Sequence, residues 1–360
     1  MEINRVVLEN LFSSICDRVR TSVRQSNHSV VQQAAETLSS QTGQAESLHV
    51  IAASALTHSD PDRTLKTIDR IDRWQEFDAV ANRLDGFAWL MKGHHHHASC
   101  CLERAVSLAP DLPDCWFFLG RIAEEDGLTE LAIKSFQRGA IFEDAPHQCA
   151  LALARLFRSK RHLTEAIHTL RVSLIRDRRS ADLNLALARL LQRRSVVLGH
   201  RKRHALQDRV LAEALECYRI VNQVRPDTRS LIAQGRLQQR LHQNEAARQS
   251  FQKAVRMDPG SADALRHLAG VQVDFGDLET AVTHFEEALK MAPKRAEFHF
   301  RYTRAKRFTA EASTRRYIAR LNELLKDSEG VERKQVFLHF ALGKIHDDVG
   351  NHDQAWRHYE

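Results

Sequence analysis

The sequence feature that most constrains this chain is a period of about 34 residues in the positions of its small side chains. Six alanines follow one phase of this period, in two runs with spacings of 33 or 34 residues: Ala98, Ala132, Ala166, Ala214, Ala247 and Ala281. Twelve residues before five of them lies a second small residue: Gly86, Gly120, Ala154, Gly235 and Ala269. Self-similarity at this period is typical of helical repeat arrays.

Prolines mark the end of each period. Four of the 7 prolines lie twelve residues after a periodic alanine: Pro110, Pro226, Pro259 and Pro293. Proline cannot donate a backbone hydrogen bond, so it ends the second of two helices, while the paired small residues let those helices approach closely. Such a helix hairpin cannot bury its apolar stripe alone and stacks on the next one. The sequence therefore predicts an all-α chain of stacked helix hairpins.

Two segments carry a family resemblance. DCWFFLGRIAEEDGLTELAIKSFQRGAIFED resembles a tetratricopeptide repeat (TPR), and SADALRHLAGVQVDFGDLETAVTHFEEALKMAP resembles the same repeat. The residues that match the TPR signature are Trp116, Leu119, Gly120, Gly127, Ala132 and Phe136 in the first segment, and Leu265, Leu268, Ala269, Gly276, Ala281, Phe285, Ala288 and Pro293 in the second. The resemblance implies a right-handed superhelical solenoid of TPR helix hairpins.

The repeat frame divides the chain into four parts. They are an N-terminal helical segment (1–44), a TPR array of about seven repeats (45–295), a helical linker out of phase with the repeats (296–334) and a last, truncated TPR (335–360). One repeat has an insertion near 195–207, where either the hairpin turn has grown or both helices are longer. The basic run 193–209 could contact an acidic partner or nucleic acid, although a solvated basic loop is the interpretation that we favour.

The C-terminal part has a second resemblance. The cues AKRFT, IARLNELL and LHFALGKIHDDVGNHDQAWRHYE resemble the linker and last repeat of bacterial TPR proteins that continue into a sulfotransferase domain. No phosphate-binding glycine loop occurs in the chain, so that catalytic domain is absent from these 360 residues. Because the chain stops inside a helix that holds Trp356 and Tyr359, we expect the natural protein to continue; a true terminus is the alternative.

Arginine recurs at one position of the repeat. The residue after the small one in each first helix, which faces the concave groove in TPR proteins, is Arg121, Arg155, Arg189 or Arg236. Three further arginines, Arg158, Arg193 and Arg240, lie about one turn later. A row of guanidinium groups suits carboxylates or phosphates, so we expect these seven arginines to form a groove for acidic peptides. The alternative, that arginine is simply a good helix former on exposed faces, is equally open.

Charge and composition narrow the function classes. A net charge of +7 favours an acidic protein or peptide partner only slightly. RNA binding by a helical repeat is the less favoured alternative, because the 4 Trp and 4 Tyr are not interleaved with the basic residues. No catalytic motif occurs, so we expect no enzyme and no cofactor within the chain. The sequence has no signal peptide and no apolar span, which predicts a cytoplasmic protein without membrane contact.

One stretch suggests metal chemistry. MKGHHHHASC places His94–His97 before Cys100 and Cys101, and two His–Cys pairs at i,i+4 spacing could chelate a metal ion. In the repeat frame Gly93 is the glycine of a hairpin turn, and His162, His242 and His352 recur near the same turn. We therefore expect an exposed, histidine-rich turn without a metal.

Overall fold

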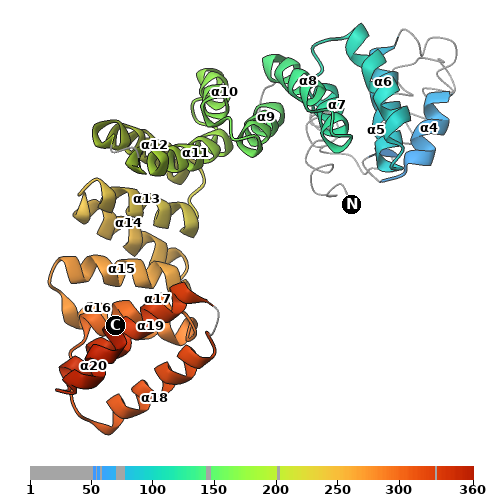
Figure 1. Cartoon of the computed structure of the whole chain (residues 1–360). Coiled ribbons are helices and arrows are strands. Elements are labelled where there is room, and N and C mark those ends of the chain that lie inside the picture. Colours follow the sequence, from blue (N-terminus) through green and yellow to red (C-terminus); the bar gives the residue numbers. More distant parts are fainter. Residues whose placement is uncertain are drawn as a thin grey trace. The chain divides into compact units, whose positions relative to one another are not determined.

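The computed structural model describes residues 52–53, 55–56, 59–69, 78–142, 147–200, 203–328 and 331–360. All regular secondary structure in these ranges is helical, which confirms the all-α prediction (Figure 1). The predicted N-terminal segment 1–44 lies outside the described residues. The chain divides into two compact units, residues 1–177 and residues 178–360.

The first unit is built from antiparallel helix hairpins. Its helices are α4 (Pro61–Asp69), α5 (Ala79–Met91), α6 (His95–Leu108), α7 (Pro113–Glu125), α8 (Thr129–Phe142), α9 (Gln148–Ser159) and α10 (Leu163–Arg176). Helices α5 and α6, α7 and α8, and α9 and α10 pair with each other, and each hairpin also contacts the next. This nearest-neighbour pattern is that of a helical repeat array.

The second unit continues the pattern and then changes it. Its helices are α11 (Ala181–His200), α12 (His204–Val224), α13 (Thr228–Arg240), α14 (Asn244–Met257), α15 (Ala262–Asp274), α16 (Leu278–Met291), α17 (Ala296–Ala305), α18 (Ala312–Lys326), α19 (Glu332–Asp348) and α20 (His352–Tyr359). The extra residues of the expected insertion lengthen α11 and α12, whereas Arg201 and Lys202 lie outside the described residues.

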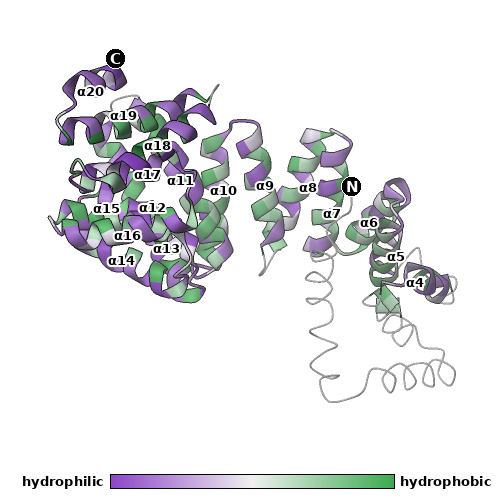
Figure 2. Cartoon of the chain, turned by 90° about the horizontal axis from the view of Figure 1, so that it is seen from below, coloured by the Kyte–Doolittle hydropathy of each residue, from purple (hydrophilic) through white to green (hydrophobic). Residues whose placement is uncertain are grey.

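The periodic small residues lie where paired helices come closest. A Cβ atom on Gly120 of α7 would lie 2.5 Å from the Phe136 ring of α8. Gly235 of α13 has the same relation to Phe251 of α14, also at 2.5 Å. Both phenylalanines are fully buried. Figure 2 colours the residues by hydropathy and shows apolar and polar residues on different faces of most helices.

The turn inside most of the hairpins uses a left-handed residue; the turn between α11 and α12 includes residues outside the described part of the chain. Gly127 and Gly276 have φ angles of 75° and 80°, which glycine adopts without strain. Two hairpins have no glycine at this position and place Arg161 (φ 66°) and His242 (φ 58°) there instead. The same turn geometry therefore recurs in these hairpins even where the residue type differs.

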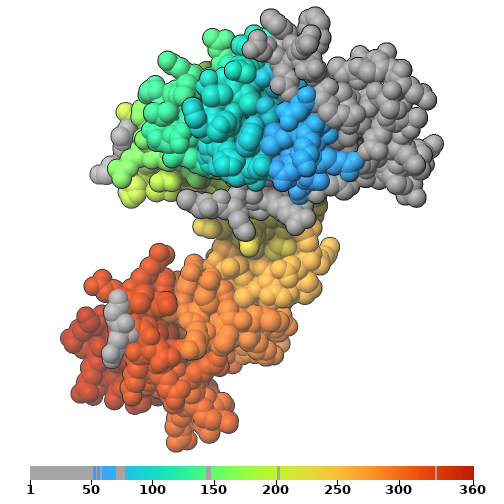
Figure 3. All heavy atoms as spheres, turned by 90° about the vertical axis from the view of Figure 1, so that its right-hand side faces the viewer, coloured from blue at the N-terminus to red at the C-terminus, as the bar shows by residue number. Residues whose placement is uncertain are grey.

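Helix α18 interrupts the succession of hairpins near the C-terminus. Helix α17 packs mainly on α19 rather than on α18, and α19 pairs with α20. Tyr317 of α18 joins an aromatic cluster with Tyr302 and Phe308, with ring centroids 5.6 and 5.9 Å from that of Tyr317. The Tyr317 hydroxyl also lies 2.6 Å from His299 Nδ1. Space-filling atoms show α15 to α20 as one continuous body (Figure 3).

Candidate functional site

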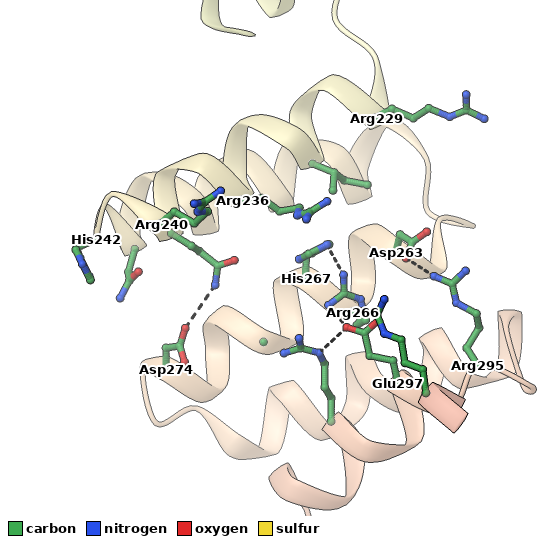
Figure 4. A pocket seen from close by; sticks show the side chains of 16 residues that line it. Arg229, Arg236, Arg240, His242, Asp263, Arg266, His267, Asp274, Arg295 and Glu297 are labelled. Atoms are coloured by element: carbon green, nitrogen blue, oxygen red, sulfur yellow. Dashed lines mark hydrogen bonds and ion pairs between the residues drawn. The ribbon is translucent and has the colours of Figure 1, made fainter. Parts of the chain in front are cut away.

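A groove of about 1150 Å³ lies within the second unit, over the first helices of successive hairpins. Its walls come from α13, α15 and α17, together with the start of α19 (Figure 4). The charged residues that line it are Arg229, Arg236, Arg240, Asp263, Arg266, Asp274, Arg295, Glu297, Arg301 and Arg333. Seven arginines face three carboxylates, so the lining carries an excess of four positive charges.

Only some of these arginines are paired. Arg295 contacts Asp263 at 2.9 Å, and Arg266 and Arg301 share the single carboxylate of Glu297, at 3.5 and 3.2 Å. Asp274 accepts a long hydrogen bond from Gln239 at 3.5 Å. Four arginines have no carboxylate partner among the residues that the structure describes: Arg229, Arg236, Arg240 and Arg333.

Arg266 lies at the floor of the groove. Its guanidinium packs over the Phe298 ring at 5.7 Å, and the residue is only 8% exposed. Burial lowers the pKa of Arg266 to about 10, although the nearby Glu297 acts in the opposite direction. Its Nε has no hydrogen-bond partner. The structure therefore holds a charged group in a place where charge is costly unless it is fully paired.

His267 does not compensate that charge. Its ring stacks on Phe251 with centroids 5.1 Å apart, and burial, reinforced by Arg266, Arg236 and Arg301, lowers the pKa of His267 to about 2. The imidazole is therefore neutral at physiological pH, and its Nε2 accepts a short contact from Arg266 Nη2. The positive charges of Arg236, Arg266 and Arg301 thus act on the neutral His267 ring, and those of Arg236 and Arg301 also act on Arg266.

In the first unit, arginines of the predicted row are paired with carboxylates. Arg121 of α7 pairs with Glu125 at 3.2 Å, and Arg155 of α9 reaches back to Glu124 at 2.6 Å. Arg158 is exposed on the last turn of α9. Two of the three arginines in this unit are therefore already paired with carboxylates.

In the second unit, Arg189 and Arg193 are exposed on α11 and do not line the groove. Arg189 and Arg236 each lie near enough to Tyr218 to lower its pKa, although burial raises that pKa more strongly. Of the seven predicted arginines, the groove contains Arg236 and Arg240.

Sequence reasoning missed five of the groove arginines, and a signal existed for one of them. Arg266 comes three residues before the small Ala269, a position that holds Phe117, Leu151, Leu185 or Ile232 in four other first helices and Arg83 in a fifth. A charged residue in a mostly apolar position of the repeat indicates a partner or a function. The others, Arg229, Arg295, Arg301 and Arg333, come from surface positions with no such signal.

The histidine-rich stretch packs around one aromatic ring. His97 stacks on Trp89 with centroids 5.1 Å apart, and His94 contacts the same ring edge-on at 5.4 Å. Cys101 donates to Asp85 at 3.2 Å, and burial raises the pKa of its thiol to about 12. Among the described residues, no group of three or more His, Cys, Asp or Glu side chains is arranged to hold a metal ion.

The search for membrane-spanning segments found no candidate. None of the helices in the described part of the chain combines the length and the apolar character that crossing a bilayer requires.

Comparison with known proteins gives one family match. Residues 232–296 match the family model described as "Tetratricopeptide repeat", which supports the predicted TPR hairpins in the segment that holds much of the groove. Repeats of this family are typically binding modules rather than enzymes. A search of curated proteins finds no match. The predicted resemblance of 296–360 to TPR–sulfotransferase proteins is not supported by these findings and stays a prediction.

Several solved structures are similar. One described as "Functional Characterization of Pseudomonas Aeruginosa pilF" has a TM-score of 0.44 at 15% identity, covering 61% of this chain and 94% of that one. A "MamA RS-1 ArsTM double mutant" has 0.41 at 17%, covering 50% and 94%. The "APC/C hetero-tetramer Cut9-Hcn1" has 0.40 at 16%, covering 82% and 58%.

Proposed function

We propose that this chain is a protein-interaction scaffold that binds extended acidic segments of a partner protein in the groove between Arg229 and Arg333. The repeat match at residues 232–296 supports the general role of a scaffold. The acidic character of the partner is our own inference from the charges of the groove.

One observation carries the proposal: the groove exposes arginines that have no carboxylate partner. Arg236 and Arg240 are both exposed and lie one turn apart on α13. Side chains that repel one another in the free protein gain stabilisation when an anionic ligand occupies the space between them. Arginine presents a planar fork of donors that matches carboxylate geometry, so each unpaired guanidinium is a preorganised anchor.

The dimensions fit an extended peptide. First helices of neighbouring hairpins lie about 10 Å apart, so α13, α15 and α17 span about 20 Å. An extended peptide advances about 3.3 Å per residue, and this span corresponds to about six residues. Such a segment would cross all three helices, and the side chains of Arg236 and Arg240 on α13 and of Arg301 on α17 would reach toward it from both sides.

The test compares charge reversal inside and outside the groove. We expect the double variant Arg236→Glu/Arg240→Glu to bind a fluorescent library of Asp- and Glu-rich peptides at least tenfold more weakly than wild type, measured by anisotropy. Arg256→Glu is the matched control, because Arg256 is an exposed arginine on α14 that does not line the groove. Equal affinities for the double variant and wild type would contradict the proposal.

The same assay, run at two salt concentrations, separates peptide binding from RNA binding. RNA held only through its backbone would lose affinity steeply between two salt concentrations, whereas tight RNA binding that survives raised salt would favour an RNA reader. The alternative that this is the substrate-recruiting region of a sulfotransferase requires the same groove to hold a substrate protein. The peptide-binding result therefore tests the scaffold proposal and the sulfotransferase alternative in the same way.

A further inference from the structure

Three arginines in the groove act on one another. Burial lowers the pKa of Arg266 and of His267, and Arg236 and Arg301 each lower both pKa values further, so these two arginines lie within electrostatic reach of both side chains. Figure 4 shows Arg236 on α13 facing His267 and Arg266 on α15 across the groove. The three residues come from three successive first helices.

These arginines share too little negative charge. Among the residues that the structure describes, Glu297 is the carboxylate that contacts these arginines, and it serves both Arg266 and Arg301. Asp263 also acts on Arg266, but its charge is balanced by Arg295, which it contacts at 2.9 Å. Arg236 has no carboxylate partner among the described residues. Three positive charges against one negative charge leave a local excess of two.

An equivalent pair in the first unit has a carboxylate that serves one arginine of this position, although the Nε of Arg83, like that of Arg266, has no hydrogen-bond partner among the described residues. Arg83 occupies the same repeat position as Arg266 and contacts Asp114, which lies 31 residues later, as Glu297 does after Arg266. The residue that corresponds to Arg301 there is Phe118, so Asp114 does not share its charge with a second arginine of that position. The excess charge around Arg266 is therefore particular to the groove rather than a general property of the repeat.

The buried arginine supplies the second, independent observation. Arg266 is only 8% exposed although it lines the groove, and its Nη1 and Nη2 contact the shared Glu297 and the neutral His267. A buried guanidinium whose carboxylate is shared destabilises the free protein, and an anion bound beside it in the groove lowers that cost.

We infer that Arg236, Arg266 and Arg301 form a subsite for the phosphoryl group of a phosphorylated side chain in the bound peptide. The inference rests on the proposed function and names the class of partner: a phosphopeptide rather than a merely acidic one. A phosphate monoester carries a charge of about −1.5 to −2 at pH 7, which balances the local excess of two. A carboxylate would leave one positive charge uncompensated.

The experiment uses the full chain and three fluorescent peptide libraries. All three have the same random Asp- and Glu-rich flanks, and the central residue is phosphoserine, glutamate or serine. We expect the phosphoserine library to bind about tenfold more tightly than the glutamate library. In Arg236→Ala/Arg301→Ala this preference should fall below twofold, because both residues are exposed and their removal leaves Arg266 in place. Arg256→Ala should retain the full preference.

A second variant tests the shared carboxylate. Glu297→Gln frees Arg266 and Arg301 from their common partner, and it should bind the phosphoserine library about threefold more tightly than wild type. A merely structural role of Glu297 predicts unchanged or weaker binding, which would count against the subsite.

The remaining outcomes keep the two proposals distinct. Equal affinity for the phosphoserine and glutamate libraries overturns the phosphoryl subsite and leaves the acidic-peptide function standing. No binding of any library overturns the function itself. Inorganic phosphate should displace the phosphoserine library only at concentrations at least tenfold above those of unlabelled phosphopeptide; equal potency would assign the subsite to free phosphate and overturn the peptide assignment.

Discussion

At the scale of single residues, the hairpin turns show how one backbone angle limits the choice of side chain. Most of these turns place glycine at a φ near +75° to +81°, as at Gly127 and Gly350. Arg161 takes the same role in the α9–α10 turn with a φ of 66°. This conformation costs a residue with a Cβ atom about 1 kcal/mol, so the α9–α10 turn is strained at Arg161 and glycine at this position would relieve the strain.

We expect Arg161→Gly to raise the free energy of unfolding by about 0.5–1 kcal/mol, since the relief of strain exceeds the added entropy of the unfolded chain. Urea denaturation followed by circular dichroism measures this change. Lys160→Gly is the control, because Lys160 has a φ of −82° and glycine there should destabilise the turn. A variant Arg161→Gly that unfolds at lower urea than wild type would show that the side chain contributes more than the strain costs.

Single residues also mark the limit of what the sequence predicted about the site. Arg236 and Arg240 were predictable because they follow a repeated small residue in phase. Arg266 required a different comparison, in which a charge replaces an apolar residue at an inward position of the repeat. Whether an arginine is available to a ligand depends on its ion pairs, and these were not predictable. Glu124 and Glu297 occupy ordinary surface positions and reach their arginine partners only across helices.

At the scale of helices, the close approach of α8 to its neighbours depends on Gly139. A Cβ atom there would lie 2.3 Å from Cys149 Sγ on α9 and 2.9 Å from Trp116 Cβ on α7. Cys149 is fully buried and cannot move outward without opening the packing. Helices α7 and α9 can therefore both pack closely on α8 because residue 139 has no Cβ atom.

Gly139→Ala should lower the free energy of unfolding by about 1–3 kcal/mol, because overpacking forces the helices apart. The double variant Gly139→Ala/Cys149→Ala should recover part of that loss, since it recreates the pair Ala254 and Ala264, which pack together where two later hairpins meet. The two variants are compared by thermal unfolding. If the double variant were as unstable as the sum of the single variants, the contact between positions 139 and 149 would not be the cause.

The periodicity of the sequence predicted the helical hairpins but not how the departures from it fold. Near Arg194 the pattern left two possibilities open, and α11 and α12 are both longer than the other hairpin helices. Residues 296–334 read as helical and out of phase. Helix α17 pairs with α19, past α18, and α18 contacts α17 through interactions such as that of Tyr317 with His299, which have no counterpart in the repeat.

At the scale of the whole molecule, acid acts on the second unit through four histidines whose pKa values are lowered by burial. Burial lowers the pKa of His267, His299, His346 and His358, and all four lie in residues 178–360. Each is neutral in the folded state at pH values where the unfolded chain, with a histidine pKa near 6.5, already binds a proton. Their contribution to stability is therefore present above pH 6.5 and is lost as the pH falls toward the folded-state values.

We expect the second unit to lose about 1–2 kcal/mol of stability between pH 6.5 and pH 5, mainly through His267, whose folded-state pKa is about 2. Hydrogen exchange of the full chain, corrected for the intrinsic rate at each pH, reports the two units separately. His267→Gln should flatten the pH dependence of α15 while keeping an acceptor for Arg266. Protection in α15 that does not fall on acidification would contradict this assignment.

The ion pairs that cross from one hairpin to the next also fix the order of the hairpins. Arg83 and Arg266 each need an acidic residue 31 positions later, which a different hairpin supplies. A hairpin copied or moved elsewhere in the gene would leave one buried arginine without its acid and one acid without its arginine. Shuffling of these units during evolution is therefore restricted at the two junctions, whereas hairpins with Phe117 or Leu151 at that position carry no such requirement.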